Sequence, residues 1–406
     1  MQRSKVAMVL AGGGVAGAVY EIGALCAIDE ALCDLSVNEV DLYVGTSAGA
    51  LISSCLVNGI SPRVLLTALE TPLLGIDPLE PHHLFSFNVA DTLQRSLRLP
   101  SAILDTARRI LSERERASFL DVIEMVSVGL PTGLYDNSSL EQYLRHSLTN
   151  PGRSNSFHQL PRELLIIATD LDTGERAIFG EAPLIDVPIS QAVCASAAIP
   201  LFYRPVQIGK RYFIDGGVRG TASLDIAIER GANLIVCINP MVPFDNSHHE
   251  PGASLNDEGI QRIGNQVFRA FVHAGLHYHL KQARRRHPEV DIILIEPRRD
   301  DPVMGAENTM RYSSRLDIAR HGFESVASNL IEHDAYYRML LARHGIAIDT
   351  SRIVGALDRL QHAGNDTREL HAAMADEPII HAAPAGLAET LAELDRILKR
   401  FERVNG

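Results

Sequence analysis

The sequence lacks an excess of basic residues. Among its 406 residues, 38 lysines and arginines are outnumbered by 50 aspartates and glutamates, which gives a formal net charge of -12 at pH 7. This balance argues against broad nucleic-acid binding, and it equally disfavours purely electrostatic adsorption to anionic lipid. Any contact with a membrane is therefore expected to be local and apolar.

Long apolar runs and metal-binding cysteine motifs are also absent from the sequence. No stretch of 18 apolar residues occurs, so no bilayer-spanning helix is expected. The first apolar run is too short for a secretory signal, and glycines interrupt it. The five cysteines have no metal-ligand spacing, and their odd number is typical of reduced thiols in a cytoplasmic protein: Cys26, Cys33, Cys55, Cys194 and Cys237.

What the chain does contain is ample apolar content and an alternation of strand and helix patterns. Hydrophobic residues make up 46% and charged residues 22%, which suits one large domain or two ordinary ones. From residue 5 to about 54 the pattern reads strand, glycine turn, helix, strand, turn, helix. Such alternation predicts an α/β fold with a mainly parallel sheet that helices cover on both faces. Further strands are expected near residues 164–171, 212–215, 234–240 and 291–297, with a long helix at 259–286.

Two regions depart from this alternation. Residues from about 61 to 131 mix prolines, apolar residues and basic clusters, which predicts a mostly helical insertion. After a linker at 376–386, apolar residues repeat at alternating steps of four and three: Leu387, Leu391, Leu394, Leu398 and Phe401. This seam predicts a helix that docks on its own domain, with homo-oligomer formation as the alternative. We therefore expect a main domain over residues 1–345 and a C-terminal helical extension over 346–406.

The glycine-rich turn after the first strand has two interpretations. Its sequence, GGGVAG from Gly12 to Gly17, satisfies the G-x-G-x-x-G pattern of dinucleotide-binding turns. That interpretation requires an acidic residue at the end of the next strand, to hold the ribose hydroxyls. The next strand, VDLYV, ends instead in the sequence GTSAG. A dinucleotide site is therefore disfavoured, and no cofactor is expected.

The GTSAG sequence fits a nucleophile elbow. In a G-x-S-x-G sequence between a strand and a helix, small flanking residues permit a sharp turn that projects the serine, here Ser47, above the sheet. The alternative is a small-residue turn without chemical consequence. The neighbouring glycine loop favours the elbow, because acyl transfer needs both a nucleophile and donors for the oxyanion. The expected donors are the backbone N–H groups of Gly12, Gly13 and Gly14.

A serine nucleophile needs a base, and Asp215 in the sequence FIDGG is the favoured candidate. It follows an apolar strand, and we expect this strand end to face the same sheet edge as Ser47. A plain Asp-Gly turn is the alternative. A desolvated carboxylate within hydrogen-bond reach of Ser47 could accept its proton directly.

None of the 16 histidines lies in a comparable strand-end context. His273 and His277 are four residues apart on an expected helix and could share one face, but the sequence shows no third ligand. An ordinary helix surface is therefore favoured over a metal site, and no metal is expected.

Together, these motifs resemble those of the patatin-like phospholipases, which use a Ser-Asp dyad. The matching blocks are GGGVAG, GTSAG, AVCASAAIPLFYRPVQI and FIDGG, and the resemblance covers about residues 5–240 well. It implies a three-layer α/β/α patatin-like fold. It also implies that Ser47 forms an acyl-enzyme, with Asp215 as general base and then acid. The motif glycines expected to support this site are Gly17, Gly45, Gly49, Gly216 and Gly217.

There is one departure from the family pattern, Ala16, where the family usually has Arg or Lys. The resemblance implies a serine lipid acyl hydrolase that cleaves fatty-acyl esters of phospholipids or related glycerolipids, in the cytoplasm or in peripheral contact with a membrane. The insertion could then form a lid. Two alternatives stay open: an acyltransferase using the same dyad, and a lipid-binding protein with weak or no catalysis, for which Ala16 is the only indication.

Overall fold

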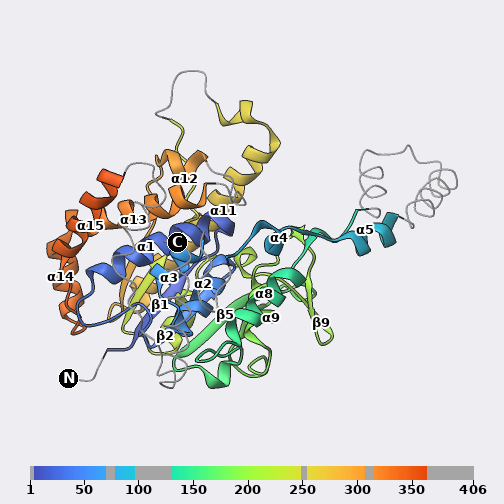
Figure 1. The fold of residues 1–406 in the computed structure, drawn as a ribbon, viewed down its shortest axis with the longest axis horizontal. Helices are drawn as coiled ribbons and strands as arrows, with labels where there is room; N and C mark the ends of the chain where they lie inside the picture. The colour runs from blue at the N-terminus through green and yellow to red at the C-terminus, as the bar shows by residue number, and fades with distance from the viewer. Residues whose placement is uncertain (1–3, 70–77, 97–129, 248–253, 307–313, 364–406) are drawn as a thin grey trace, which may run out of the picture. The chain divides into compact units, whose positions relative to one another are not determined.

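A computed structural model describes residues 4–69, 78–96, 130–247, 254–306 and 314–363 (Figure 1). The chain divides into two compact units, Met1–Met374 and Ala375–Gly406, and all described residues belong to the first. The expected linker and the leucine seam therefore lie outside the described residues, as do residues 70–77 and 97–129 of the expected insertion.

The centre of the first unit is an eight-stranded sheet in the order β11-β10-β1-β2-β5-β9-β8, with β6 paired to β5. Its five parallel strands are β11 (Asp291–Ile295), β10 (Leu234–Ile238), β1 (Val6–Leu10), β2 (Leu42–Thr46) and β5 (Glu163–Asp170). Its antiparallel strands are β6 (Arg176–Phe179), β8 (Val206–Ile208) and β9 (Arg211–Asp215). The predicted mainly parallel sheet is confirmed.

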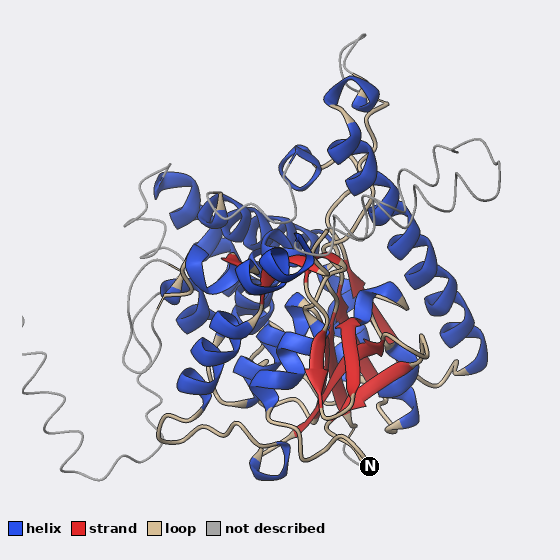
Figure 2. Ribbon diagram, turned by 90° about the vertical axis from the view of Figure 1, so that its right-hand side faces the viewer, coloured by secondary structure: helices blue, strands red, loops and turns tan. Residues whose placement is uncertain are grey.

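Helices cover both faces of this sheet, as Figure 2 shows. Alternate residues of β1 face opposite sides of the sheet. Met8 packs into a core with helices α1 (Gly14–Ala31) and α13 (Arg315–Glu332), whereas Ala7 and Val9 pack into a separate core with helices α10 (Leu224–Glu229) and α11 (Ile260–Arg286). Because both faces of the strand are covered, all five residues of β1 are buried. The three-layer α/β/α architecture is therefore confirmed.

The helices of the first face include α1 (Gly14–Ala31), α2 (Ala48–Val57), α3 (Pro62–Ala68), α9 (Ile189–Ser196) and α13 (Arg315–Glu332). Those of the second face are α10 (Leu224–Glu229) and α11 (Ile260–Arg286). No described helix alone is long and apolar enough to cross a bilayer; α2 and α3 pass that test only as a pair, bent by 120°.

The described parts of the insertion contain α3, α4 (Pro81–Leu84) and α5 (Val89–Ser96). They also contain strand β3 (Ser86–Phe87), which pairs with β4 (Gly133–Asp136) in a small sheet completed by β7 (Leu201–Tyr203). Beyond β4, helix α8 (Ser138–Leu148) packs against α9.

Three described helices follow β11 besides α13: α12 (Pro302–Ala306), α14 (Asp334–Ala342) and α15 (Thr350–Ala363). Helix α15 lies within the expected C-terminal extension, yet it packs against α1 and α13 and buries Ile353 and Leu360 in their core. This part of the extension thus belongs to the first compact unit, while the expected boundary at residue 345 stays a prediction.

Candidate active site

Ser47 occupies the sharp turn between β2 and α2. Its backbone has φ 54° and ψ -118°, a left-handed conformation that is uncommon for a residue with a side chain. Gly49 makes the turn sterically feasible, because a Cβ atom there would lie 2.2 Å from the Leu10 carbonyl oxygen. Gly45 packs closely against the start of α2, where a Cβ atom would lie 2.6 Å from the Ala50 Cα. Both motif glycines thus support a strained serine at the N-terminus of a helix, which is the geometry of a nucleophile elbow.

A second serine fixes the backbone of this turn. The Ser47 N–H donates to Ser196 Oγ at 2.8 Å, and that hydroxyl in turn donates to the carbonyl oxygen of Ile167 on β5. Both serines are buried. In the sequence, Ser196 lies within the block AVCASAAIPLFYRPVQI, and its position there gives no sign of this contact.

Asp215 lies level with Ser47 because of strand register. Strand β9 runs antiparallel to β5, so the last residue of β9, Asp215, does not lie beside the last residue of β5. Asp215 pairs with Ala168 of β5, and the preceding residue of β5, Ile167, pairs with Thr46 of β2. Ile167 pairs with both β2 and β6, and Ala168 pairs with both β6 and β9, so β2 and β9 lie on the same side of β5. Their ends are close together, because a Cβ atom on Gly216 would lie 3.0 Å from Thr46 Cγ2.

The Asp215 carboxyl group is almost fully buried, with 5% exposure. Its Oδ1 accepts the Gly217 N–H at 2.7 Å. The Ser47 hydroxyl is near enough to influence the carboxylate, but the pair does not meet the geometry of a formed hydrogen bond, and Oδ2 has no partner among the described residues. Burial raises the pKa of Asp215 to about 6, against smaller lowering effects of Ser47 and Gly217. The carboxylate therefore has a free acceptor and the basicity of a general base.

The glycine loop lies directly against the serine. A Cβ atom on Gly12 would approach the Ser47 Cβ to 3.2 Å, so the loop contacts the nucleophile. The Gly12 N–H, however, donates to the Thr221 carbonyl at 3.2 Å, which corrects its expected role as a free oxyanion donor. Gly13 and Gly14 stand at the start of α1, and Gly14 has the left-handed φ of 61° that favours glycine. The remaining predicted donors are therefore their two N–H groups.

The other motif glycines support these elements. Gly17 packs against Pro240 after β10, and Gly216 packs against the Ile167 carbonyl on β5. Ala16, in the first turn of α1, is buried in the core, so no cation enters the site from this position. A cationic side chain from another element lies near the site. Arg262 of α11 lines a cavity that also contains Ser47 and Asp215, and it pairs with Glu258 at 3.1 Å.

Two cavities meet at Ser47. The larger, of about 640 Å³, is lined by the glycine loop, Ser47, Asp215 and the first turns of α11. The smaller, of about 120 Å³, is almost entirely apolar and runs between α1, α2, α3 and α8. Gly14, Ser47 and Ile199 line both cavities. The serine thus stands where an open chamber joins a narrow apolar one.

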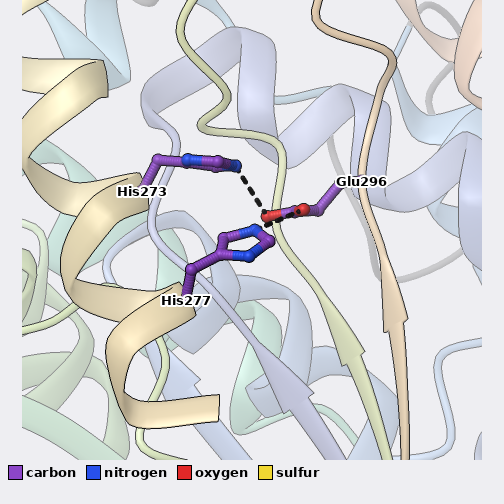
Figure 3. A group of neighbouring side chains, drawn as sticks. All are labelled: His273, His277 and Glu296. Carbon is purple, nitrogen blue, oxygen red and sulfur yellow. Dashed lines mark hydrogen bonds and ion pairs between the residues drawn. The ribbon is translucent and has the colours of Figure 1, made fainter. Parts of the chain in front are cut away.

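Outside these cavities, the structure gives the two helical histidines a third neighbour. His273 and His277 project from α11 toward Glu296, which directly follows β11 (Figure 3). The ligand atoms of the three side chains lie within 4.8 Å of one another. Helix spacing alone does not reveal this third neighbour, because Glu296 lies 19 residues beyond His277 in the chain. Its position after an apolar strand, at the carboxyl edge of the sheet, was the signal that could have found it.

A family model described as patatin-like phospholipase matches residues 8–228. The chain is 22% identical over 228 residues to a probable lipid hydrolase, 463L, of Invertebrate iridescent virus 6, covering 55% of this chain and 63% of that protein. It is 22% identical over 232 residues to an uncharacterized NTE family protein of Mycobacterium tuberculosis, covering 57% of this chain and 30% of that protein. The chain thus spans less than two thirds of the length of either relative.

Among solved structures, VipD from Legionella pneumophila is similar with a TM-score of 0.35 and 13% identity, over 82% of this chain and 67% of that one. The type III effector ExoU is similar with a TM-score of 0.34 and 14% identity, over 81% of this chain and 53% of that one. The family match covers more than half of the sequence, and it includes both the elbow and the aspartate motif. The chain belongs to the patatin-like phospholipase family.

Proposed function

We propose that the protein is a serine lipid acyl hydrolase that works through a Ser47 acyl-enzyme, with Asp215 as general base and then general acid. Membership of a phospholipase family and the similarity to a lipid hydrolase support hydrolysis of lipid esters. The observation that carries the finer assignment is the free, buried Oδ2 of Asp215, in one cavity with Ser47 and the glycine loop.

In the first half-reaction, Asp215 Oδ2 takes the proton of the Ser47 hydroxyl while Oγ attacks the ester carbonyl carbon. The tetrahedral intermediate then collapses, and Asp215 returns the proton to the departing alcohol oxygen. In the second half-reaction, Asp215 takes a proton from water, whose oxygen attacks the acyl-enzyme, and the proton returns to Ser47 Oγ. A pKa of about 6 lets the carboxyl group act in both directions near neutral pH.

The oxyanion formed in each half-reaction requires preset donors. In this proposal Gly13 and Gly14 supply backbone N–H groups from the N-terminus of α1, and the N-terminus of α2 lies under Ser47. Both helix ends carry partial positive charge that favours a developing anion. Loss of one such donor typically costs about 2.7–4 kcal/mol of transition-state stabilisation, so these groups can replace the cation that Ala16 does not provide.

The two cavities suit the two parts of a lipid ester. The apolar cavity follows α1 from Gly14 to Ile22 and α2 from Ser47 to Cys55, which is about 12 Å along each helix. An acyl chain placed there puts its carbonyl carbon at Ser47. The alcohol portion then occupies the larger cavity, where Arg262 lies.

The mouth of the larger cavity suits contact with a lipid surface. Large apolar side chains that line it are strongly exposed: Leu201 (82%), Phe202 (40%), Val218 (40%), Ile260 (89%) and Phe268 (42%). Insertion of such side chains below the headgroups would let a lipid enter the cavity without crossing water. We therefore propose peripheral, transient membrane contact by a cytoplasmic protein, with apolar rather than charge-driven attachment.

Active-site labelling tests the proposal. A fluorophosphonate probe should label the wild-type protein at Ser47, and the Ser47→Ala and Asp215→Asn variants should each lose at least about 1,000-fold in esterase activity. Ser53→Ala is a matched control, since Ser53 is a buried serine on the same helix α2. Retained turnover in purified Ser47→Ala protein contradicts the proposal. Mass spectrometry of products formed with added glycerol separates hydrolysis from acyl transfer.

A further inference from the structure

His273, His277 and Glu296 form a cluster between helix α11, on the second face of the sheet, and the end of strand β11. The histidines stand one turn apart on α11, with ring centroids 4.1 Å apart, and Glu296 directly follows β11 (Figure 3). His277 Nε2 lies 2.9 Å from Glu296 Oε2, and His273 Nε2 lies 3.6 Å from Oε1. Both imidazole Nε2 atoms thus face one carboxylate.

We propose that His273, His277 and Glu296 bind one zinc ion through the two imidazole Nε2 atoms and the glutamate carboxylate. Two histidines and one carboxylate form a frequent ligand set for zinc. At zinc–ligand distances of 2.0–2.2 Å, tetrahedral ligand atoms are separated by about 3.3–3.6 Å. The observed nitrogen–oxygen separations of 2.9 and 3.6 Å lie near this range, and all three ligand atoms lie within 4.8 Å of one another, so rotation of the side chains can bring them around one ion.

The surroundings of Glu296 fit the role of a metal ligand. Asn239, directly after β10, donates its Nδ2–H to Glu296 Oε1 at 2.7 Å, which orients the carboxylate as outer-shell partners commonly do. The His277 side chain is 44% exposed, so a water can complete the coordination.

This ion would hold α11 against the sheet. Helix α11 has 27 residues, of which only Arg269, Val272, Leu276 and Leu280 are buried. Its first turns form one wall of the larger cavity, including Arg262 and Phe268. His273 and His277 follow these turns along α11, so a metal ion bound to them would fix the helix next to the cavity wall. We infer a stabilising role for zinc that supports the cavity without touching the reacting atoms, and this role does not depend on the proposed hydrolysis.

The alternative is a cluster held only by ion pairing, with a protonated His277 against Glu296. The two arrangements differ in what a metal titration measures. A bare ion pair gives no stoichiometric zinc uptake, whereas a three-residue site takes one equivalent. Imidazole ligands favour zinc over magnesium and calcium, so neither of those ions should compete.

Zinc titration of the metal-stripped full chain, in competition with a chromophoric chelator, tests the site. We expect one equivalent bound with submicromolar Kd, and a rise in Tm that EDTA reverses. His277→Ala and Glu296→Gln should each raise Kd at least about 100-fold, and Asn239→Ala about 10-fold. His279→Ala is the matched control, because His279 is an exposed histidine on the same helix outside the cluster, and it should bind zinc like the wild type.

Folding of each variant is checked by its Tm in EDTA. An equal Tm without metal, together with loss of the zinc-dependent rise, supports the site. Zinc binding by His277→Ala with unchanged Kd overturns the proposal, as does a wild-type protein that takes up no zinc below about 10 μM. Fluorophosphonate labelling in EDTA reports on Ser47 separately, so failure of the metal site and failure of the proposed hydrolase are distinguishable.

Discussion

Ser196 holds Ser47 in its strained conformation through a side-chain hydroxyl that accepts the Ser47 N–H at 2.8 Å. The same hydroxyl donates to the Ile167 carbonyl, so helix α9 and strand β5 both act on the turn. A residue with φ 54° persists only when surrounding contacts enforce it. Ser196 is therefore a positioning residue for the proposed nucleophile.

Replacement of Ser196 by alanine tests this relationship. The Ser47 N–H then loses its acceptor in a buried site, which costs about 1–3 kcal/mol of stability. We expect kcat to fall at least about 10-fold, with KM little changed, because the turn relaxes while the lipid-binding cavities persist. Ser53→Ala, which removes another buried hydroxyl, should leave kcat unchanged. Equal effects of the two substitutions on kcat would refute a specific role for Ser196.

The pH dependence of labelling follows from the raised pKa of Asp215. A general base must be ionised, and a carboxyl group with a pKa of about 6 loses its charge below that pH. The second-order rate of fluorophosphonate labelling should therefore be constant above about pH 7 and fall about tenfold per unit below pH 5.5. Measurement from pH 4.5 to 8 checks this. A plateau that extends down to pH 4.5 contradicts the assignment.

Because the pKa of Asp215 is raised, ionisation of its carboxyl group lowers the free energy of unfolding at neutral pH. Its carboxyl pKa is about 6 in the native state against 3.8 as reference, so the native state prefers the protonated form. As pH rises from about 4 to above 6, ionisation of this buried group removes about 3 kcal/mol of stability. Asp215→Asn avoids that loss. We expect its unfolding free energy in urea, relative to wild type, to rise by about 3 kcal/mol between pH 4 and 7.

The fold was predictable where local patterns decide the outcome. The strands and helices around residues 5–54 carry clear apolar periodicity, and GTSAG specifies a turn whose glycines are needed by close contacts with Leu10 and the start of α2. These motifs need little tertiary information. The resemblance to the patatin-like phospholipases, stated from the same motifs, is confirmed by the family match.

The features that the sequence could not reveal depend on the register of strands in the sheet and on contacts between residues far apart in the chain. The antiparallel direction of β9 and its pairing of Asp215 with Ala168 come from sheet assembly, not from the FIDGG motif. Engagement of the Gly12 N–H by Thr221 joins residues more than 200 positions apart. In the same way, Glu296 meets His273 and His277 only because β11 and α11 pack together.

The apolar cavity yields a prediction about acyl-chain length. Cys55 lies eight residues after Ser47, about 12 Å along α2, and lines the far part of this cavity with 8% exposure. Cys55→Phe should fill that part while leaving the space at Ser47 intact. We expect kcat/KM for esters of twelve or more carbons to fall at least about 10-fold, and kcat/KM for butyryl esters to stay unchanged.

The matched control for this substitution is Cys55→Ala, which enlarges the same part of the cavity and should retain long-chain activity. Overpacking by phenylalanine costs about 1–3 kcal/mol of stability, so the unchanged butyryl activity also shows that the site stays folded. An equal loss for short and long esters would mean that the substitution disturbs the elbow rather than the chain-binding space. An unchanged preference would place the acyl chain elsewhere, because a chain bound along α2 must meet residue 55.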